Sequence, residues 1–308
     1  MRKTVLITGA AGFIGSHIVD KFISNNYHVV AVDNLKTGNK RNINSRAEYY
    51  NVDLNRAVDV KKMLKKYKPT QIIHHASNLV DVELSVKNPS RAYKDVPMTI
   101  NLLEEAVRNG LEHFIFSSSA NIYGNKLKTA AKESYEDDPS SPYGLTKQAI
   151  EKFIKYASSR YNFKHTILRY FNVYGERQNI NSQAAIPTFI KQLIIGQPLQ
   201  IRGGNQLRDF VYVGDVAVAN LLAAQAKKNF TFNIGSGKQV ELKSLVMLIT
   251  NIMGKKPTIQ YIDREAADSF YSGGIITKAK RELGWRPQTS LKKGLTQTID
   301  YYLKLVKR

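Results

Sequence analysis

The stretch Val5-Leu6-Ile7-Thr8-Gly9-Ala10-Ala11-Gly12-Phe13-Ile14-Gly15-Ser16-His17 decides the fold of this chain. Four apolar or β-branched residues predict a short strand, three glycines follow at every third position, and an apolar-periodic run then predicts a helix. The glycines permit a tight turn and let a phosphate approach the backbone without meeting a Cβ atom. The N-terminus of the helix offers unpaired N–H groups and a partial positive charge to that phosphate. The stretch therefore predicts a nucleotide-binding turn.

A carboxylate ends the next predicted strand, at a distance from the glycines that is typical of dinucleotide-binding folds. The strand is His28–Val32 and the carboxylate is Asp33. In such folds this group holds the hydroxyls of the adenosine ribose, and it would repel a 2′-phosphate. We therefore predict NAD, and not NADP, as the cofactor. The spacing Gly-x-x-Gly-x-x-Gly is a variant of the usual motif, and the alternative interpretation is a plain glycine-rich turn.

The composition of the 308-residue chain excludes several kinds of site. There is no cysteine, so disulfides and thiolate metal sites are excluded. The neighbours His74 and His75 lie on a predicted strand and point to opposite faces, so we predict no metal site. No stretch approaches the ~18 apolar residues of a membrane span, and the first strand begins too early for a signal peptide. We expect no membrane association and a cytoplasmic location.

The formal net charge of +21 favours anionic ligands. The densest basic run is Lys61, Lys62, Lys65, Lys66 and Lys68. The apolar residues between these lysines recur at helical spacing, which indicates the solvated face of an amphipathic helix. The other interpretation is a nucleic-acid patch. Because no aromatic-rich basic module interrupts the chain, we do not predict nucleic acid as a partner.

Predicted strands and helices alternate along the first half of the chain. Apolar strands are expected at Val5–Thr8, His28–Val32, Glu48–Val52, Gln71–His75 and Phe114–Phe116, and a helix is expected from Met98 to Asn109. Strands buried on both faces and separated by helices predict an α/β fold with a doubly wound parallel sheet. Asp53 follows the third strand, where it could hydrogen-bond the adenine amine or cap a helix.

Hydroxyl groups follow the last strand of this series, at the edge where a parallel sheet holds its ligands. The run is Ser117-Ser118-Ser119.

A second motif opens an amphipathic helix further along the chain. Its sequence is Tyr143-Gly144-Leu145-Thr146-Lys147. Tyr143 and Lys147 are one helical turn apart, so their side chains meet. The ordinary pKa of a phenol, near 10, is too high for a base at neutral pH. An adjacent ammonium group and a positively charged nicotinamide ring both favour the phenolate, so we predict Tyr143 as the base, with Ser119 sharing the hydrogen bond of the substrate hydroxyl.

Together these motifs resemble the extended short-chain dehydrogenase/reductase family, and within it the UDP-sugar 4-epimerases. The resemblance rests on Thr8–Gly15, Asp33–Leu35, Asp53-Leu54, Ser117–Ala120, Tyr123-Gly124, Tyr143–Lys147, Arg169–Gly175, Arg208–Val213, Phe232–Gly235 and Leu283–Trp285, which occur in family order. It implies a Rossmann fold and NAD-dependent epimerisation at C4 of a UDP-hexose through a transient 4-keto sugar. The UDP-glucose and UDP-galactose pair is expected, with the N-acetylhexosamine pair left open. A homodimer is implied by the same resemblance.

The resemblance also implies roles for individual residues. The catalytic residues are Ser119, Tyr143 and Lys147. The cofactor-binding residues are Gly9, Gly12, Phe13, Ile14, Gly15, Asp33, Asn34, Asp53, Leu54, Ala76, Tyr143, Lys147 and Tyr170. The substrate-binding residues are Ser119, Tyr143, Asn172, Arg208, Arg264 and Ser272. For the two arginines, the alternative is ordinary surface salt bridging.

The chain departs from the family pattern at three places. The usual Asn-Val-x-Gly-Thr is here Asp95-Val96-Pro97-Met98-Thr99, which places a carboxylate near the cofactor side. The usual Arg-x-Gly-Asp becomes Arg264–Asp268, one residue longer and without glycine. Gly273-Gly274-Ile275 replaces a stretch that normally carries Ala-Asp. Ser272 falls where these enzymes line the 2′ position of the sugar, and a small residue there predicts room for an N-acetyl group; a shifted loop could instead fill the space with Phe270 or Tyr271.

Two interleaved domains are predicted. Residues 1–171 form the NAD-binding domain, to which a segment at about 208–239 partly returns, and residues 172–207 and 240–308 form the substrate domain. An alternative within the family is a nucleotide-sugar 4,6-dehydratase or decarboxylase, which needs an extra acid beside the catalytic serine. Ala120 and Asn121 follow that serine, and neither titrates. A non-enzymatic NAD-binding protein that binds nucleic acid is the other alternative, and the presence of all three catalytic residues argues against it.

Overall fold

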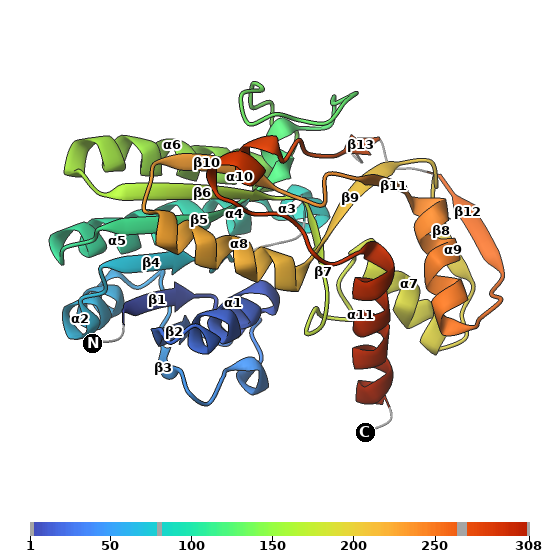
Figure 1. Ribbon diagram of the computed structural model, residues 1–308, viewed down its shortest axis with the longest axis horizontal. Coiled ribbons are helices and arrows are strands. Elements are labelled where there is room, and N and C mark those ends of the chain that lie inside the picture. Colours follow the sequence, from blue (N-terminus) through green and yellow to red (C-terminus); the bar gives the residue numbers. More distant parts are fainter. Residues whose placement is uncertain (1–2, 79–81, 264–269, 307–308) are drawn as a thin grey trace.

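The centre of the molecule is a seven-stranded sheet. The computed structural model describes residues 3–78, 82–263 and 270–306. The strand order is β10-β6-β5-β4-β1-β2-β3, and every pair is parallel (Figure 1). The strands are β1 (Thr4–Thr8), β2 (His28–Asp33), β3 (Glu48–Asn51), β4 (Gln71–His74), β5 (His113–Ser119), β6 (Lys164–Tyr170) and β10 (Phe230–Ile234). The predicted doubly wound parallel sheet is confirmed.

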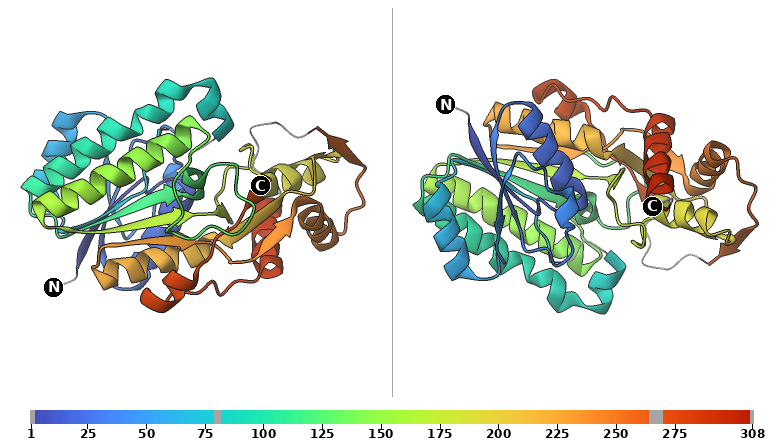
Figure 2. Two further views of the ribbon diagram at one scale, coloured as in Figure 1. Left: turned by 90° about the horizontal axis from the view of Figure 1, so that it is seen from above. Right: turned by 90° about the horizontal axis from the view of Figure 1, so that it is seen from below.

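Helices cover both faces of this sheet (Figure 2). One layer contains α1 (Phe13–Ser24) and α8 (Val213–Ala226), and the other contains α2 (Ala57–Tyr67), α5 (Asp95–Arg108) and α6 (Pro142–Tyr161). Alternate residues of a strand enter the two layers because side chains alternate across a strand. In β1, Val5 and Ile7 pack with the first layer, whereas Leu6 packs with the second.

Of three elements predicted from the sequence, one agrees with the structure and two are longer than predicted. In α2 the buried residues are Val60, Met63 and Leu64, and the lysines between them are exposed, as the amphipathic pattern predicted. The helix expected from Met98 begins earlier, at Asp95, with Pro97 in its first turn, where a missing N–H costs nothing. All three serines of the 117–119 run belong to β5 itself, so that strand extends beyond the apolar core predicted for it.

A smaller set of elements lies at one end of the large sheet, on the right in Figure 1. Its strands are β7 (Asn172–Tyr174), β9 (Leu207–Tyr212), β11 (Gln239–Glu241) and β13 (Tyr271–Ser272), with a separate pair of β8 (Leu199–Arg202) and β12 (Ile259–Ile262). Its helices are α7 (Ala185–Ile194), α9 (Leu242–Met253) and α11 (Leu291–Val306). These elements share their own apolar core, which includes Leu199, Leu245 and Leu295.

The chain passes repeatedly between the two parts. After β9 it forms α8 and then β10, which pairs with β6 in the large sheet. Near the end, α10 (Thr277–Glu282) packs on β10, and the Trp285 indole N–H donates to the carbonyl of Asp215 in α8 at 2.9 Å. The chain therefore crosses between the two parts more than once, and the exact division of its residues into an NAD-binding and a substrate domain stays a prediction.

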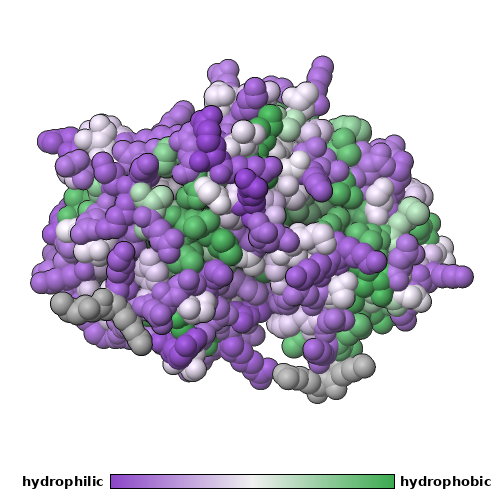
Figure 3. All heavy atoms as spheres, viewed as in Figure 1, coloured by the Kyte–Doolittle hydropathy of each residue, from purple (hydrophilic) through white to green (hydrophobic). Residues whose placement is uncertain are grey.

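Short helices lie between the longer elements of the fold. The short helices are η1 (Lys40–Asn42), α3 (Val82–Lys87), α4 (Pro89–Tyr93) and η2 (Ala120–Tyr123). Within the described residues, no helix has the length and apolar character needed to cross a membrane. Hydrophilic side chains cover most of the face seen in Figure 3, as expected for a chain of this charge.

Candidate active site

The glycine-rich turn between β1 and α1 leaves no space for side chains. Gly9 has a φ of +67°, and a Cβ atom there would lie 2.9 Å from the backbone nitrogen of Ala76. A Cβ atom on Gly15 would collide with the Gly9 carbonyl oxygen. The first turn of α1 thus lies directly against β1, and the helix begins at Phe13 after Gly12, which has no side chain to cap it. This turn can accept a diphosphate at the exposed N–H groups of the helix.

The Asp33 carboxylate ties this turn to the loop after β2. Its Oδ2 accepts a hydrogen bond from Ala11 N–H at 3.0 Å, and its Oδ1 accepts one from Leu35 N–H at 2.8 Å. A Cβ atom on Gly38 would lie 2.9 Å from the same carboxylate. Asn34 accepts from the backbone of Lys36 and so shapes the same loop. The carboxylate that sequence reasoning assigned to ribose therefore also anchors the backbone around the nucleotide turn.

Asp53 lies beside this loop, after β3, with Leu54 buried behind it. Lys36 Nζ donates to Asp53 Oδ2 at 2.7 Å, and Asn55 donates to Oδ1 from both its backbone and its side chain. Partial burial would raise the pKa of Asp53, but these hydrogen bonds outweigh burial and lower the pKa to about 2. Asp53 is therefore an ionised hydrogen-bond acceptor.

The catalytic residues predicted from the sequence meet where β5 ends and α6 begins. Ser119 is the last residue of β5, and its hydroxyl forms a hydrogen bond with Tyr143. The N-terminus of α6 is capped by Ser141, whose side chain accepts from Gly144 N–H at 3.1 Å. One turn into the helix, Lys147 is 3% exposed and its Nζ lies 5.6 Å from the centroid of the Tyr143 ring. The structure thus brings Ser119, Tyr143 and Lys147 together.

Burial dominates the electrostatics of this group. It raises the pKa of the Tyr143 phenol above its usual value, the Asp95 carboxylate raises it further, and the hydrogen bond with Ser119 lowers it. Burial also lowers the pKa of Lys147, whereas the charge of Asp95 raises it. The chain by itself therefore holds Tyr143 protonated, which differs from the expectation that Lys147 lowers this pKa. A positively charged nicotinamide would favour the phenolate.

Two neutral imidazoles lie beneath the site. His74 donates to or accepts from the hydroxyls of Thr8 at 2.8 Å and Thr99 at 2.9 Å, and His75 stacks on Tyr170 at 5.4 Å. Burial, and then the charge of Lys147, lower the pKa of both histidines to about 3. The two rings thus contact different neighbours; His74 is the last residue of β4, and His75 follows the strand, which is one residue shorter than predicted. Tyr170, a predicted cofactor residue, lies opposite Ser119 in the β5–β6 register.

Three predicted substrate residues lie in the small sheet that contains β9. Arg208 is on β9, Ser272 on β13 is its register partner, and Asn172 on β7 is the partner of Phe210. The Asn172 amide donates to the carbonyl of Asp209 at 3.0 Å, and Arg208 donates to the carbonyls of Leu207 and Phe270. The fourth predicted residue, Arg264, lies outside the described residues.

The two glycines after Ser272 make room for protein side chains. A Cβ atom on Gly273 would lie 2.5 Å from the Gln239 side-chain nitrogen, and one on Gly274 would overlap the Phe171 ring. The backbone of Gly273 and Ile275 forms hydrogen bonds with Ala131, which lies between β5 and α6. The glycines therefore serve close packing, and any extra width of a sugar pocket at this wall depends on Ser272 itself.

Asp95 is a buried carboxylate near this group that the sequence-based site assignment did not include. It is 2% exposed and accepts hydrogen bonds from Ser77 Oγ and from the backbone and side chain of Asn78. Its departure from the family pattern was visible in the sequence. Its charge acts on Tyr143 and Lys147 because α5 packs against α6.

The chain matches a family model over most of its length and known proteins along nearly its whole length. The model of the NAD dependent epimerase/dehydratase family matches residues 5–235. The chain belongs to this family. A protein described as a putative UDP-glucose 4-epimerase of Methanocaldococcus jannaschii is 40% identical over 303 residues, which cover 96% of this chain and 97% of the relative.

Solved structures of this epimerase family superpose closely on the chain. The structure of a UDP-glucose 4-epimerase from Thermotoga maritima with UDP-glucose has a TM-score of 0.94 and 37% identity, and covers 98% of this chain and 99% of that one. A UDP-N-acetylglucosamine 4-epimerase from Methanobrevibacter ruminantium in complex with UDP-N-acetylmuramic acid has a TM-score of 0.93 and 32% identity, with 99% of each chain covered. These matches confirm the family resemblance inferred from the motifs.

The NAD predicted from the sequence is the cofactor of this epimerase family. The residues present fit it, because the absence of side chains at Gly9 and Gly15 lets the N-terminus of α1 pack directly against the end of β1, where its free N–H groups can receive a diphosphate. Gly12, Phe13 and Ile14 lie at the start of α1, Asp33 ends β2 and Asn34 follows it, and Ala76 lies against Gly9 just after β4. Their individual contacts with NAD stay predictions.

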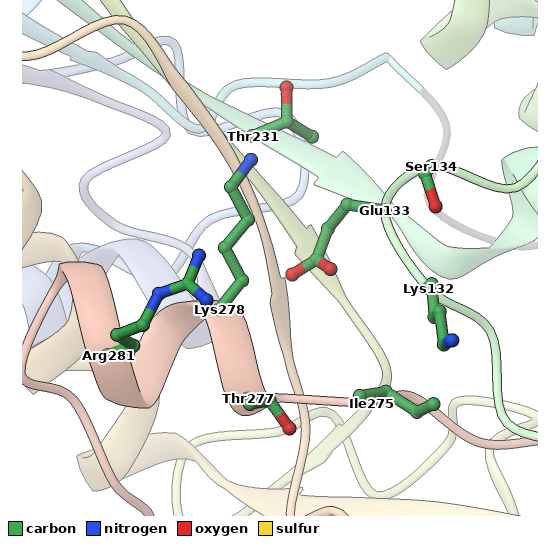
Figure 4. Close-up of a pocket in the computed structure, with 8 residues that line it drawn as sticks. All are labelled: Lys132, Glu133, Ser134, Thr231, Ile275, Thr277, Lys278 and Arg281. Carbon is green, nitrogen blue, oxygen red and sulfur yellow. The ribbon is translucent and has the colours of Figure 1, made fainter.

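A separate pocket of about 710 Å³ lies at the outer edge of the large sheet, beside β10 and α10. The described residues that line it are Lys132, Glu133, Ser134, Thr231, Ile275, Thr277, Lys278 and Arg281 (Figure 4). None of them belongs to the predicted site of the epimerase family. Glu133, in the middle of this group, accepts from the backbone N–H of Asn233 at 2.9 Å, so part of its charge already serves the fold.

Proposed function

We propose that the chain catalyses NAD-dependent epimerisation at C4 of a UDP-hexose through a transient 4-keto sugar. The observation that carries the proposal is the meeting of Ser119, Tyr143 and Lys147 at the carboxyl end of β5, on the edge of the sheet that also holds the glycine turn. In a doubly wound sheet, ligands bind at this edge. A base, a hydroxyl donor and a buried cation there suit removal of a proton from a sugar hydroxyl.

The chain's own residues handle the proton. Tyr143, as phenolate, takes the proton from the 4-hydroxyl of the sugar, and Ser119 hydrogen-bonds the same oxygen. When bound, NAD supplies a nicotinamide ring that accepts the C4 hydride and returns it. The 4-keto sugar rotates so that its opposite face is presented. Tyr143 then gives the proton back to the oxygen at C4, so no proton is gained or lost over the cycle. Lys147 is a buried cation within one helical turn that favours the phenolate form.

The residues around β9 suit the remainder of the substrate. In this proposal Arg208 pairs with oxygens of the diphosphate, which carries negative charge, and Asn172 hydrogen-bonds the same part of the ligand. Arg264 is assigned the same role from the family pattern. Ser272, the register partner of Arg208, lines the sugar.

The small side chain of Ser272 supports a wide sugar pocket. We propose that the UDP-N-acetylglucosamine and UDP-N-acetylgalactosamine pair is accepted in addition to the UDP-glucose and UDP-galactose pair. A large aromatic residue at this position would leave room for a hydroxyl only. Forcing additional atoms into a packed wall costs roughly 1–3 kcal/mol, which corresponds to about a tenfold to hundredfold preference.

A product analysis tests the proposed function. The purified protein is incubated with NAD and, separately, UDP-glucose, UDP-galactose and their N-acetyl counterparts, and the products are separated by chromatography. We expect interconversion of the C4 epimers by the wild type and conversion at least ~10²-fold slower by Tyr143→Phe. Absence of any C4-epimer product from the whole panel would refute the proposal.

A further inference from the structure

Two hydrogen bonds converge on the hydroxyl oxygen of Ser119, and both come from Asn121. The backbone N–H of Asn121 donates to Ser119 Oγ at 3.2 Å, and the side-chain Nδ2 of Asn121 donates to the same oxygen at 3.0 Å. Ser119 is the N-cap of η2, a position where a serine oxygen accepts from the backbone two residues further on. A serine oxygen can accept two hydrogen bonds and donate one. Asn121 therefore fills both acceptor positions of Ser119.

The single proton of the Ser119 hydroxyl has to point elsewhere, because the two N–H groups of Asn121 offer it no acceptor. The Tyr143 phenol also hydrogen-bonds this hydroxyl, and this contact acts to lower the pKa of Tyr143 against the larger effect of burial. Such lowering is the effect of a donor that stabilises the phenolate. In this hydrogen bond Ser119 is therefore the donor, and the Tyr143 oxygen is the acceptor.

The main chain of Asn121 is held against the first turn of α6, which carries Tyr143. A Cβ atom on Gly144 would lie 2.6 Å from the Asn121 carbonyl oxygen, so this close approach requires glycine. The same carbonyl accepts from Gly124 N–H at 3.3 Å. The Asn121 side chain is exposed, whereas Ser119 is buried. The backbone thus fixes an exposed amide beside a buried hydroxyl.

A serine proton with a fixed direction suits the charge that develops in the proposed reaction. When the 4-hydroxyl of the sugar loses its proton to Tyr143, negative charge grows on the sugar oxygen. A donor that already points at this oxygen stabilises the charge without reorganisation. A freely rotating hydroxyl could instead turn its proton toward other acceptors. Asn121 prevents this, because it presents only donors to Ser119.

We propose that Asn121 is a positioning residue, which occupies both acceptor positions of Ser119 so that the serine proton is donated toward the reacting oxygens of Tyr143 and the sugar. The proposal rests on the proposed function for its effect on turnover. Asn121 takes no part in the proton transfer and acts only through the Ser119 hydroxyl. Its effect should therefore disappear when that hydroxyl is absent.

The test is a double-mutant cycle of Asn121→Asp and Ser119→Ala. Aspartate has nearly the shape of asparagine, and Asn121 is exposed in the first turn of η2, so the fold is expected to tolerate the change. A carboxylate only accepts hydrogen bonds, so it draws the serine proton away from Tyr143 and the sugar. We expect Asn121→Asp to lower kcat for UDP-glucose at least ~10-fold more when Ser119 is present than in the Ser119→Ala background. Equal losses in both backgrounds would show that the new charge acts without the serine, which overturns the proposal.

Two further variants serve as comparisons in the same assay. Asn121→Ala removes the side-chain donor and adds no acceptor, so kcat should fall less, by about threefold. A larger loss in Asn121→Ala than in Asn121→Asp would contradict a role through the serine proton. Asn25→Asp is the matched control, because the Asn25 amide also donates to a serine hydroxyl, Ser24 Oγ at 3.4 Å, but at the end of α1. This control should leave kcat unchanged.

A second measurement separates this proposal from the proposed function. The protein is labelled with tyrosine carrying ¹³C at Cζ, saturated with NAD and titrated by NMR without sugar, and the Tyr143 signal is identified by its absence in Tyr143→Phe. Asn121→Asp should raise the Tyr143 pKa by about one unit more when Ser119 is present than in the Ser119→Ala background, because only then does the phenolate lose a donor. If the wild type converts no UDP-sugar but this difference is seen, the proposed function fails and the role of Asn121 stands. A difference below ~0.2 unit would show that Asn121 does not direct the serine proton.

Discussion

Replacing Glu151 by alanine removes the carboxylate of a buried ion pair with Arg169, next to β5. Glu151 lies one turn beyond Lys147 on α6 and is 1% exposed. Its carboxylate accepts from Arg169 Nε at 2.9 Å, from Arg169 Nη2 at 2.7 Å and from Ser118 Oγ at 2.6 Å. Ser118 precedes Ser119, which is predicted to be catalytic, and the ion pair fixes β5, β6 and α6 relative to one another.

The stability lost in Glu151→Ala follows from the charged Arg169 that the variant leaves without its main partner. Burial would lower the pKa of Arg169, but the hydrogen bonds and charge of Glu151 outweigh burial and raise it. Arg169 is 2% exposed and stays charged without its partner, and breaking a buried pair in this way costs ~3–5 kcal/mol. Asp137 at 3.1 Å and the Tyr123 hydroxyl at 3.0 Å remain, so we expect about 3 kcal/mol. Total stability is commonly ~5–15 kcal/mol, so the loss is large.

Urea unfolding followed by circular dichroism measures this loss. The free energy of unfolding is obtained from the midpoint and the slope for wild type, Glu151→Ala and Glu151→Gln. The glutamine variant keeps an acceptor oxygen and should lose less than the alanine variant. Glu112→Ala, which breaks the exposed pair with Lys227, is the control and should change stability by ~0.5 kcal/mol or less. A loss below ~1 kcal/mol in Glu151→Ala would show that the ion pair is not the stabilising feature described here.

Three further predictions concern the catalytic group and the sugar wall. Tyr143→Phe should retain NAD, measured by cofactor absorbance after gel filtration, and lose at least ~10²-fold in kcat because only the proton acceptor is removed; near-wild-type turnover would exclude this residue as the base. Lys147→Ala should reduce kcat and move the acid limb of the pH profile upward, because the phenolate loses its nearest cation; an unchanged limb contradicts that role. Ser272→Tyr should lower kcat/KM for the N-acetyl sugars by about tenfold to hundredfold relative to UDP-glucose and UDP-galactose; equal kcat/KM values for both pairs would show that another residue sets the width.

Much of the fold could be predicted because its signals are local. The glycine spacing, the apolar strands and the Tyr143–Lys147 spacing each depend on residues within one turn or one strand of each other. Strand alternation then places side chains on known faces: in β1, Val5 and Ile7 enter one helical layer and Leu6 enters the other. The family membership followed from the order of these local motifs along the chain.

Long-range packing decided the rest. The sequence shows a phenol at Tyr143 and a carboxylate at Asp95, but only tertiary packing buries the phenol. That burial, followed by the charge of Asp95, raises the pKa of Tyr143 where the sequence predicted a lower one. The glycines at 273 and 274 suggest an open wall, yet Gln239 and Phe171 fill their space. Burial and charge depend on neighbours far apart in the chain, and a linear pattern carries no information about their distances. The sequence therefore determined the fold class and the cofactor and predicted the catalytic trio, and the tertiary structure alone decided the electrostatic environment of these three residues.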